Sequence, residues 1–148
     1  MKKIILLGDS IRLSYGNRVR ELLGEGYTVW QPEDNCRFAA YTLRMLFEYK
    51  DQLEGADVIH WNNGLWDVCD LFGDGAFTPI DAYCDTMVRI ARILKTYGKT
   101  VIFATTTPVN PLHPHNRNEL IVEYNQLIVP HLEKLGIIIN DLHGVVAP

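Results

Sequence analysis

The sequence has few of the features that mark membrane, secreted or nucleic-acid-binding proteins. No apolar run approaches the roughly 20 residues that a transmembrane helix needs, and the apolar start is too short for a secretory signal. The three cysteines among the 148 residues are too widely spaced for a disulfide framework or a CxxC metal pair. The formal net charge of -4 disfavours nucleic acid or an anionic membrane as a partner. We therefore expect a cytoplasmic protein without a metal site.

The sequence does contain a regular alternation of two hydrophobic patterns. Apolar, β-branched runs predict five strands, and several are apolar on both faces, which is typical of a parallel sheet covered on each side by helices. These strands are expected at residues 3–8, 27–31, 57–62, 100–105 and 137–142. Helical patterns lie between them, and the third helix is predicted to have Thr78 as its N-cap, Pro79 at its first position and Gly98 at its end.

This order predicts a single α/β domain over residues 1–148. Right-handed crossovers favour an open, doubly wound, flavodoxin-like sheet of three layers with strand order 2-1-3-4-5. Functional residues are then expected at the carboxyl ends of strands 1 and 3. Only residues 144–148 follow the last strand, too few for a full closing helix. An apolar face should therefore stay partly exposed, which predicts a partner surface such as a homodimer, a truncated C-terminus or lower stability.

The strongest functional signal is Gly8-Asp9-Ser10, where the first strand passes into the first helix. Gly8 allows a tight turn, and Ser10 then lies at a helix N-terminus, whose N–H groups and dipole favour a developing oxyanion. The same residues also fit a plain helix cap. The motif therefore predicts a nucleophile only in combination with other residues at the same edge of the sheet.

Such residues follow the third strand, in Asn62-Asn63-Gly64. Asn side chains and a Gly N–H at this edge can donate to an oxyanion, although Asn-Gly is also a common turn dipeptide. Two amide donors that face a serine from the first strand favour a catalytic site over a bare turn.

Several stretches together resemble the GDSL/SGNH hydrolase superfamily over essentially the whole chain. They are residues 8–12 (GDSIR), 33–38 (EDNCRF), 62–67 (NNGLWD), 105–108 (TTTP), 124–125 (YN) and 140–142 (NDL). The resemblance implies a serine esterase that hydrolyses a small ester, for example an O-acetyl ester, without a cofactor. It makes Ser10 the nucleophile next to Asp9, with oxyanion donors from the Ser10 N–H, from the stretch near Asn35, and from Asn62 in preference to Asn63.

The chain departs from the superfamily pattern in two places. In the Gly-x-Asn-Asp frame that begins at Gly64, Trp66 stands where the family has Asn. The C-terminal Asp-x-x-His block is absent, and Asp141-Leu142-His143 is one residue short of it. His143 is the best local candidate for the general base. Two alternatives stay open: an incomplete or truncated domain without hydrolase activity, and a flavodoxin-like binding module.

Overall fold

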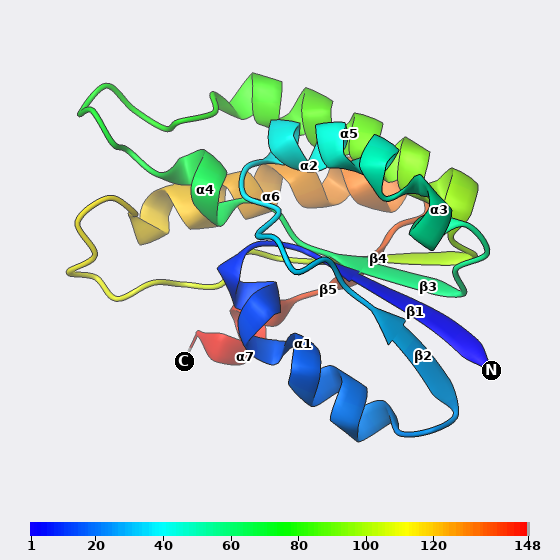
Figure 1. The fold of residues 1–148 in the computed structure, drawn as a ribbon. Coiled ribbons are helices and arrows are strands. Elements are labelled where there is room, and N and C mark those ends of the chain that lie inside the picture. The colour runs from blue at the N-terminus through cyan, green and yellow to red at the C-terminus, as the bar shows by residue number, and fades with distance from the viewer. Residues whose placement is uncertain (148) are drawn as a thin grey trace.

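In the computed structural model, which describes residues 1–147, a five-stranded parallel sheet lies between two layers of helices (Figure 1). The elements in chain order are β1 (Lys2–Leu7), α1 (Ser10–Leu23), β2 (Tyr27–Trp30), α2 (Ala39–Glu48), α3 (Lys50–Leu53), β3 (Val58–Trp61), α4 (Leu65–Val68), α5 (Ile80–Tyr97), β4 (Thr100–Ala104), α6 (Asn118–Lys134), β5 (Ile138–Asn140) and α7 (Leu142–Val146). The strand order β2-β1-β3-β4-β5 confirms the predicted topology.

The main hydrophobic core lies between the sheet and helices α2, α5 and α6. Alternate residues of each strand point into it, because successive side chains of a strand face opposite sides. The strand residues that are completely buried there are Ile5, Leu7, Ile59, Trp61 and Phe103. Complete burial of one such side chain contributes roughly 1.5–3 kcal/mol relative to its exposure. The apolar runs of the sequence therefore become the central strands.

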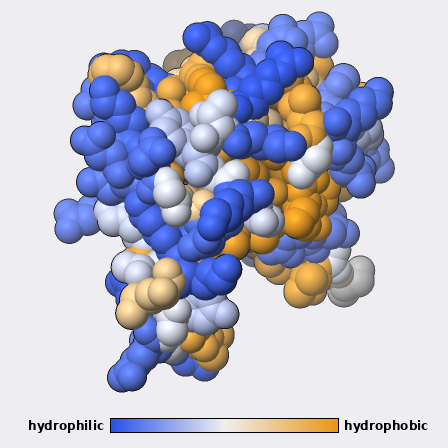
Figure 2. Space-filling model, turned by 90° about the vertical axis from the view of Figure 1, so that its right-hand side faces the viewer, coloured by the Kyte–Doolittle hydropathy of each residue, from blue (hydrophilic) through white to orange (hydrophobic). Residues whose placement is uncertain are grey.

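The opposite face of the sheet is less completely covered. Within residues 1–147, only α1 and the five-residue α7 lie on it (Figure 1). Ile138 of β5 is 54% exposed, and Val145 and Val146 of α7 are exposed as well. Figure 2 shows apolar atoms gathered in one continuous area to the right of centre. The homodimer expected to cover such a surface stays a prediction.

The start of α5 differs from its prediction. Pro79, not Thr78, is the N-cap residue, and no side chain caps this helix. The Thr78 hydroxyl instead donates to Asp67 Oδ1 at 2.7 Å, and the Thr78 carbonyl accepts from the Tyr124 hydroxyl. Thr78 as the N-cap is therefore wrong, because a distant buried carboxylate competes successfully for its side chain. Gly98 does end the helix, as predicted.

The carboxyl ends of the strands meet at one edge of the sheet, the left edge in Figure 1. β1 lies between β2 and β3. The chain therefore passes from β1 to β2 on one side of β1, and then crosses back to β3 on its other side. The turn from β1 into α1 and the turn from β3 into α4 are therefore neighbours. This switch point is where open α/β sheets usually bind their ligands.

Candidate active site

Ser10 is the first residue of α1, and its side chain is exposed at the switch point. Asp9 is the N-cap, and its Oδ1 accepts a hydrogen bond from the Ile11 N–H at 3.0 Å. Within residues 1–147, neither the hydroxyl nor the backbone N–H of Ser10 has a hydrogen-bond partner. A helix N-terminus with an unused N–H group attracts negative charge. The helix cap and the proposed nucleophile are thus neighbouring residues with separate tasks.

The Asn62 amide lies directly against the Gly8-Asp9 turn. Its Oδ1 accepts from the Asp9 N–H at 3.2 Å, and its Nδ2 donates to the Tyr15 hydroxyl at 3.1 Å. A Cβ on Gly8, where φ is +156°, would lie only 2.6 Å and 2.7 Å from the two polar atoms of this amide. Gly8 is therefore needed for the close approach. Since an amide nitrogen carries two hydrogens, one N–H of Asn62 is left for a ligand.

A chain of polar side chains behind Asn62 fixes its orientation. Tyr15 Oη lies 3.4 Å from His60 Nδ1, and His60 Nε2 lies 3.2 Å from Asn140 Nδ2. Burial lowers the pKa of His60 and raises the pKa of Tyr15 to about 12, so both side chains are uncharged at neutral pH. The chain joins α1, β3 and the end of β5. It holds the Asn62 amide without placing a competing charge beside Ser10.

The neighbouring Asn63 has no such free hydrogen. Its Nδ2 donates to Thr42 Oγ1 at 2.8 Å and to the Arg37 carbonyl at 3.1 Å, and its Oδ1 accepts from the Trp61 indole at 3.0 Å. These bonds tie β3 to the start of α2. The geometry therefore favours Asn62 over Asn63 as the side-chain donor.

Gly64 and Asp67 hold the turn that follows. A Cβ on Gly64 would lie 2.0 Å from Thr106 Oγ1, so the turn packs closely against the end of β4. Asp67 is completely buried, and both of its oxygens accept from the Ala39 N–H at 3.1 Å. Trp66, between them, is 39% exposed. The Gly-x-x-Asp frame is thus a structural anchor that presents Trp66 at the surface.

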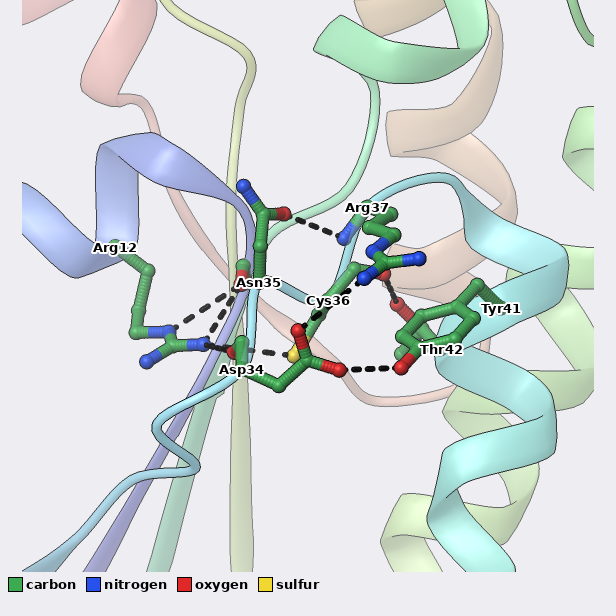
Figure 3. A network of polar contacts seen from close by, with 8 residues as sticks. Arg12, Asp34, Asn35, Cys36, Arg37, Tyr41 and Thr42 are labelled. Atoms are coloured by element: carbon green, nitrogen blue, oxygen red, sulfur yellow. Dashed lines mark hydrogen bonds and ion pairs between the residues drawn. The ribbon is translucent and has the colours of Figure 1, made fainter.

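A buried arginine fastens the loop after β2 to the turn between β1 and α1 (Figure 3). Arg12 is completely buried and donates to the carbonyls of Pro32 at 2.7 Å, Asp34 at 2.7 Å and Gly8 at 3.0 Å. The Cys36 N–H also donates to the Gly8 carbonyl, at 3.0 Å. The guanidinium has no carboxylate partner among residues 1–147, and it lies beneath the helix N-terminus that carries Ser10.

Asn35 lies in the loop that Arg12 holds. Its side-chain Oδ1 accepts from the Arg37 N–H at 2.7 Å, and Arg37 adopts a left-handed backbone with φ of 53°. Figure 3 shows the Asn35 side chain directed toward Arg37 rather than toward Arg12. The side chain is thus used within its own turn, and the expected oxyanion donor from this stretch is a backbone N–H that stays a prediction.

His143 lies in α7, which follows β5 at the same edge of the sheet. Its backbone N–H donates to Thr105 Oγ1 at 2.9 Å, and Thr105 in turn donates to Asp141, the N-cap of α7. His143 and Asp141 help to line a cavity of about 510 Å³ against α6. Over the described part of the chain, no imidazole is hydrogen-bonded to Ser10. The role of His143 as general base stays a prediction.

The remaining histidines, except for the neighbouring His113 and His115, lie apart from one another in the described structure. In residues 1–147 no group of three or more His, Cys, Asp or Glu side chains is placed to hold an ion. His113 Nδ1 accepts from the N–H groups of His115 and Asn116, so the HxH segment is tied into its own loop. No helix in the described residues is long and apolar enough to cross a bilayer.

Burial raises the pKa of Asp9 from 3.8 to about 6, and this gives a test of its environment. Between about pH 4 and 6 the folded protein holds this proton more tightly than the unfolded chain, so its contribution to stability falls as the pH rises. Asp9→Asn keeps an acceptor for the Ile11 N–H but has no proton to release, so the decrease in stability that Asp9 causes as the pH rises is removed. We expect the variant to be more stable than the parent by roughly 1–3 kcal/mol at pH 7 and equal to it near pH 4.

Urea unfolding of both proteins from pH 4 to pH 7 measures this difference. Asp67, whose pKa burial also raises to about 6, is present in both proteins, so its direct contribution cancels. A stability difference that grows toward acidic pH would show that the Asp9 carboxylate is favoured by its surroundings rather than disfavoured.

No family model and no curated protein matches the sequence. Solved structures do match the fold. The acetyl xylan esterase AlAXEase aligns with a TM-score of 0.75 and 18% identity over 97% of this chain and 79% of that one. The acetylxylan esterase Axe2 of Geobacillus stearothermophilus has a TM-score of 0.72 and 14% identity over 98% and 78% of the two chains.

A GDSL-like lipase from Bacteroides thetaiotaomicron aligns with a TM-score of 0.69 and 19% identity over 93% of this chain and 67% of its own. At identities this low, the likeness concerns the fold and not the activity. The three alignments each cover at least 93% of this chain, so the shared fold includes the sheet described above. The chain therefore shares its fold with these acetyl xylan esterases and with this GDSL-like lipase.

Proposed function

We propose that this chain is a serine esterase that hydrolyses a small ester through Ser10. The observation that carries the proposal is the pairing of an exposed Ser10, at the N-terminus of α1, with the Asn62 amide held against the turn beneath it. A nucleophile and a fixed hydrogen-bond donor on adjacent strand ends are the two parts that acyl transfer needs first.

The chemistry follows from this arrangement. Ser10 Oγ attacks the ester carbonyl while its proton passes to a base, and the carbonyl oxygen becomes an oxyanion. The Ser10 N–H and the remaining Asn62 N–H donate to that oxyanion. The alcohol then leaves with the proton from the base, and an acyl-Ser10 forms. Water attacks this acyl group while the base takes its proton, and Ser10 leaves with that proton as the acid is released.

His143 is the proposed base. It lies on α7, after the strand that ends at Asn140, and its imidazole makes no hydrogen bond within the described residues. Catalytic hydrogen bonds are often long in the absence of substrate and shorten in the complex. Asp141 accepts from the Gly144 N–H as the N-cap of α7 and thereby steadies the helix that carries His143.

The structural neighbours support a short acyl group. Two of the matching proteins are acetyl xylan esterases. An acetyl group needs little space beside Ser10, and the turn around Gly8 and Asn62 is closely packed. We propose an O-acetyl ester as the substrate.

A fluorophosphonate probe tests the proposal directly. It phosphonylates only an activated serine, so we expect a single adduct on Ser10, identified by mass spectrometry of the intact protein and of its peptides. Ser10→Ala should abolish the adduct, and Ser14→Ala is the matched control because Ser14 lies on the same helix with its hydroxyl bonded to the Ile11 carbonyl.

The competing hypothesis is a catalytically incomplete domain with this fold that has no hydrolase activity. The lack of any imidazole hydrogen-bonded to Ser10 within residues 1–147 favours this alternative. A folded protein that stays unlabelled after prolonged incubation with the probe would establish it and would rule out the esterase. Labelling that His143→Ala removes would instead assign the base.

A further inference from the structure

Aromatic side chains gather on the surface at the start of α2 and along the turn that follows Asn63. Phe38 contacts Phe77 with ring centroids 5.2 Å apart and Trp66 at 6.5 Å, and it also packs against Tyr41 at 6.2 Å. Trp66 and Phe77 are 39% and 47% exposed. We call Phe38, Tyr41, Trp66 and Phe77 the aromatic shelf. Solvent-exposed rings at this density are a feature of binding surfaces rather than of an ordinary surface.

The shelf is joined to the residues that form the candidate site. Trp66 belongs to the 64–67 turn that follows Asn62 and Asn63. Phe38 follows Arg37, whose carbonyl accepts from Asn63 Nδ2 and whose N–H donates to Asn35 Oδ1. The shelf therefore rests on the same two turns that flank the proposed oxyanion position. A ligand bound on it would lie at the same edge of the sheet as Ser10.

A fixed ion pair borders the rings. Arg37 Nη2 lies 3.5 Å from Asp34 Oδ1, and both side chains are less than half exposed. The Arg37 guanidinium lies over the Tyr41 ring, 4.7 Å from its centroid, and the Tyr41 hydroxyl donates to Asp34 Oδ2. Figure 3 shows the carboxylate of Asp34 between Arg37 and Tyr41. The shelf thus combines apolar ring faces with oriented polar donors and acceptors at one border.

From this juxtaposition we propose that the aromatic shelf binds a pyranose ring of the alcohol part of the substrate. The inference rests on the proposed esterase function and assigns its substrate to the O-acylated saccharides. The C–H face of a sugar packs on aromatic rings, whose faces carry partial negative charge. Its hydroxyl groups can donate to Asp34 and accept from Arg37, which are placed beside the rings.

Other ligands fit this surface less well. A hydrocarbon chain would gain nothing from the Arg37–Asp34 pair, and none of five cavities of about 300–640 Å³ in residues 1–147 is lined by a shelf residue. Phe38 is inclined by 45° to Trp66 and by 47° to Phe77, so a flat nucleobase could stack on only one of these rings at a time. A puckered ring that offers C–H groups in several directions suits inclined faces better.

Titration of the ¹⁵N-labelled protein with xylotetraose tests the proposal without any need for turnover. The chain has three tryptophans, of which Trp61 is buried and Trp66 is the most exposed, so its indole N–H resonance reports on the shelf. We expect this resonance to shift with saturation. Trp66→Ala or Phe77→Ala should weaken binding by at least about fivefold, whereas Phe72→Ala, on the same loop and 82% exposed, should not change it.

Three results would overturn the inference. They are a shift caused by octanoate or adenosine but not by xylotetraose, a shift that depends on protein concentration alone, and xylotetraose binding that both shelf variants leave unchanged. The binding arm is repeated in Ser10→Ala, so it does not depend on catalysis. Labelling of Ser10 together with no xylotetraose binding would reject the shelf and leave the esterase. Binding to the shelf without labelling would reject the esterase alone.

Discussion

Replacement of Arg12 by Met should lower the free energy of unfolding by about 3–5 kcal/mol. Arg12 is completely buried and donates to three backbone carbonyls from two separate segments, those of Gly8, Pro32 and Asp34. Met fills much of the volume but leaves the carbonyls of Pro32 and Asp34 without this donor. A buried carbonyl without a partner costs about 1–3 kcal/mol. The loss of unfolding free energy should therefore be several times larger than that caused by an ordinary surface substitution.

Urea unfolding at neutral pH measures this loss. Arg18→Met is the matched control, because Arg18 lies on the same helix and its ion pair with Glu21 is mostly exposed. An exposed pair of this kind contributes about 0–1 kcal/mol. Arg12→Lys should fall between the two, since one ammonium group cannot reach carbonyls on both segments. Equal effects of Arg12→Met and Arg18→Met would show that the buried contacts contribute little.

The fold could be predicted from the sequence because the hydrophobic patterns that specify each strand and helix are local and periodic. β1 is apolar on both faces, and the chain continues into a helix pattern directly after Gly8, so both the strand and its end are visible in ten residues. Predicted strand ends differ from the observed ones by one or two residues at most. The prediction for Thr78 was wrong because its partner, Asp67, is eleven residues away and no local rule connects them.

The candidate site could be predicted only in part. Gly8, Ser10 and Asn62 stand out as motif residues at strand ends, and the structure brings Asn62 against Gly8. The contacts that hold Asn62 were not foreseeable, since Tyr15 is 47 residues from it and His60 is 80 residues from Asn140. Arg12 lies in the same motif as Ser10, but nothing in the sequence indicates that a charged side chain would be buried.

The aromatic shelf was missed for a related reason. In the sequence, Trp66 stands out only because it replaces a family asparagine, while Phe38 and Tyr41 lie together at the start of α2 and Phe77 lies far along the chain, before α5. Each reads by itself as a core or loop aromatic. Asp67, which binds both the start of α2 through Ala39 and the segment before α5 through Thr78, draws these segments together. A single buried carboxylate therefore shapes the surface beside the site.

Replacement of Asn62 by Ala should reduce the rate of Ser10 labelling by about 10²- to 10³-fold, because it removes a donor to the developing oxyanion. Replacement of Asn63 by Ala should act differently. It leaves the Trp61 indole and the Arg37 carbonyl without their partners, so we expect a loss of about 2–4 kcal/mol in unfolding free energy. The labelling rate of the folded Asn63 variant should stay within about tenfold of the parent, since its amide hydrogens already have acceptors inside the protein.

Fluorophosphonate kinetics and urea unfolding on the two variants separate these roles. Asn62→Ala also removes the acceptor for the Asp9 N–H, so a loss of about 1–2 kcal/mol in stability accompanies its kinetic effect. Kinetics are therefore measured at a temperature where both variants are fully folded. If the Asn63 variant lost the greater labelling rate, Asn63 would be the oxyanion donor, and its observed bonds to Thr42 and Arg37 would have to open when substrate binds. The hydrogen-bond inventory of the two amides argues for the opposite order: only Asn62 keeps a hydrogen for the substrate.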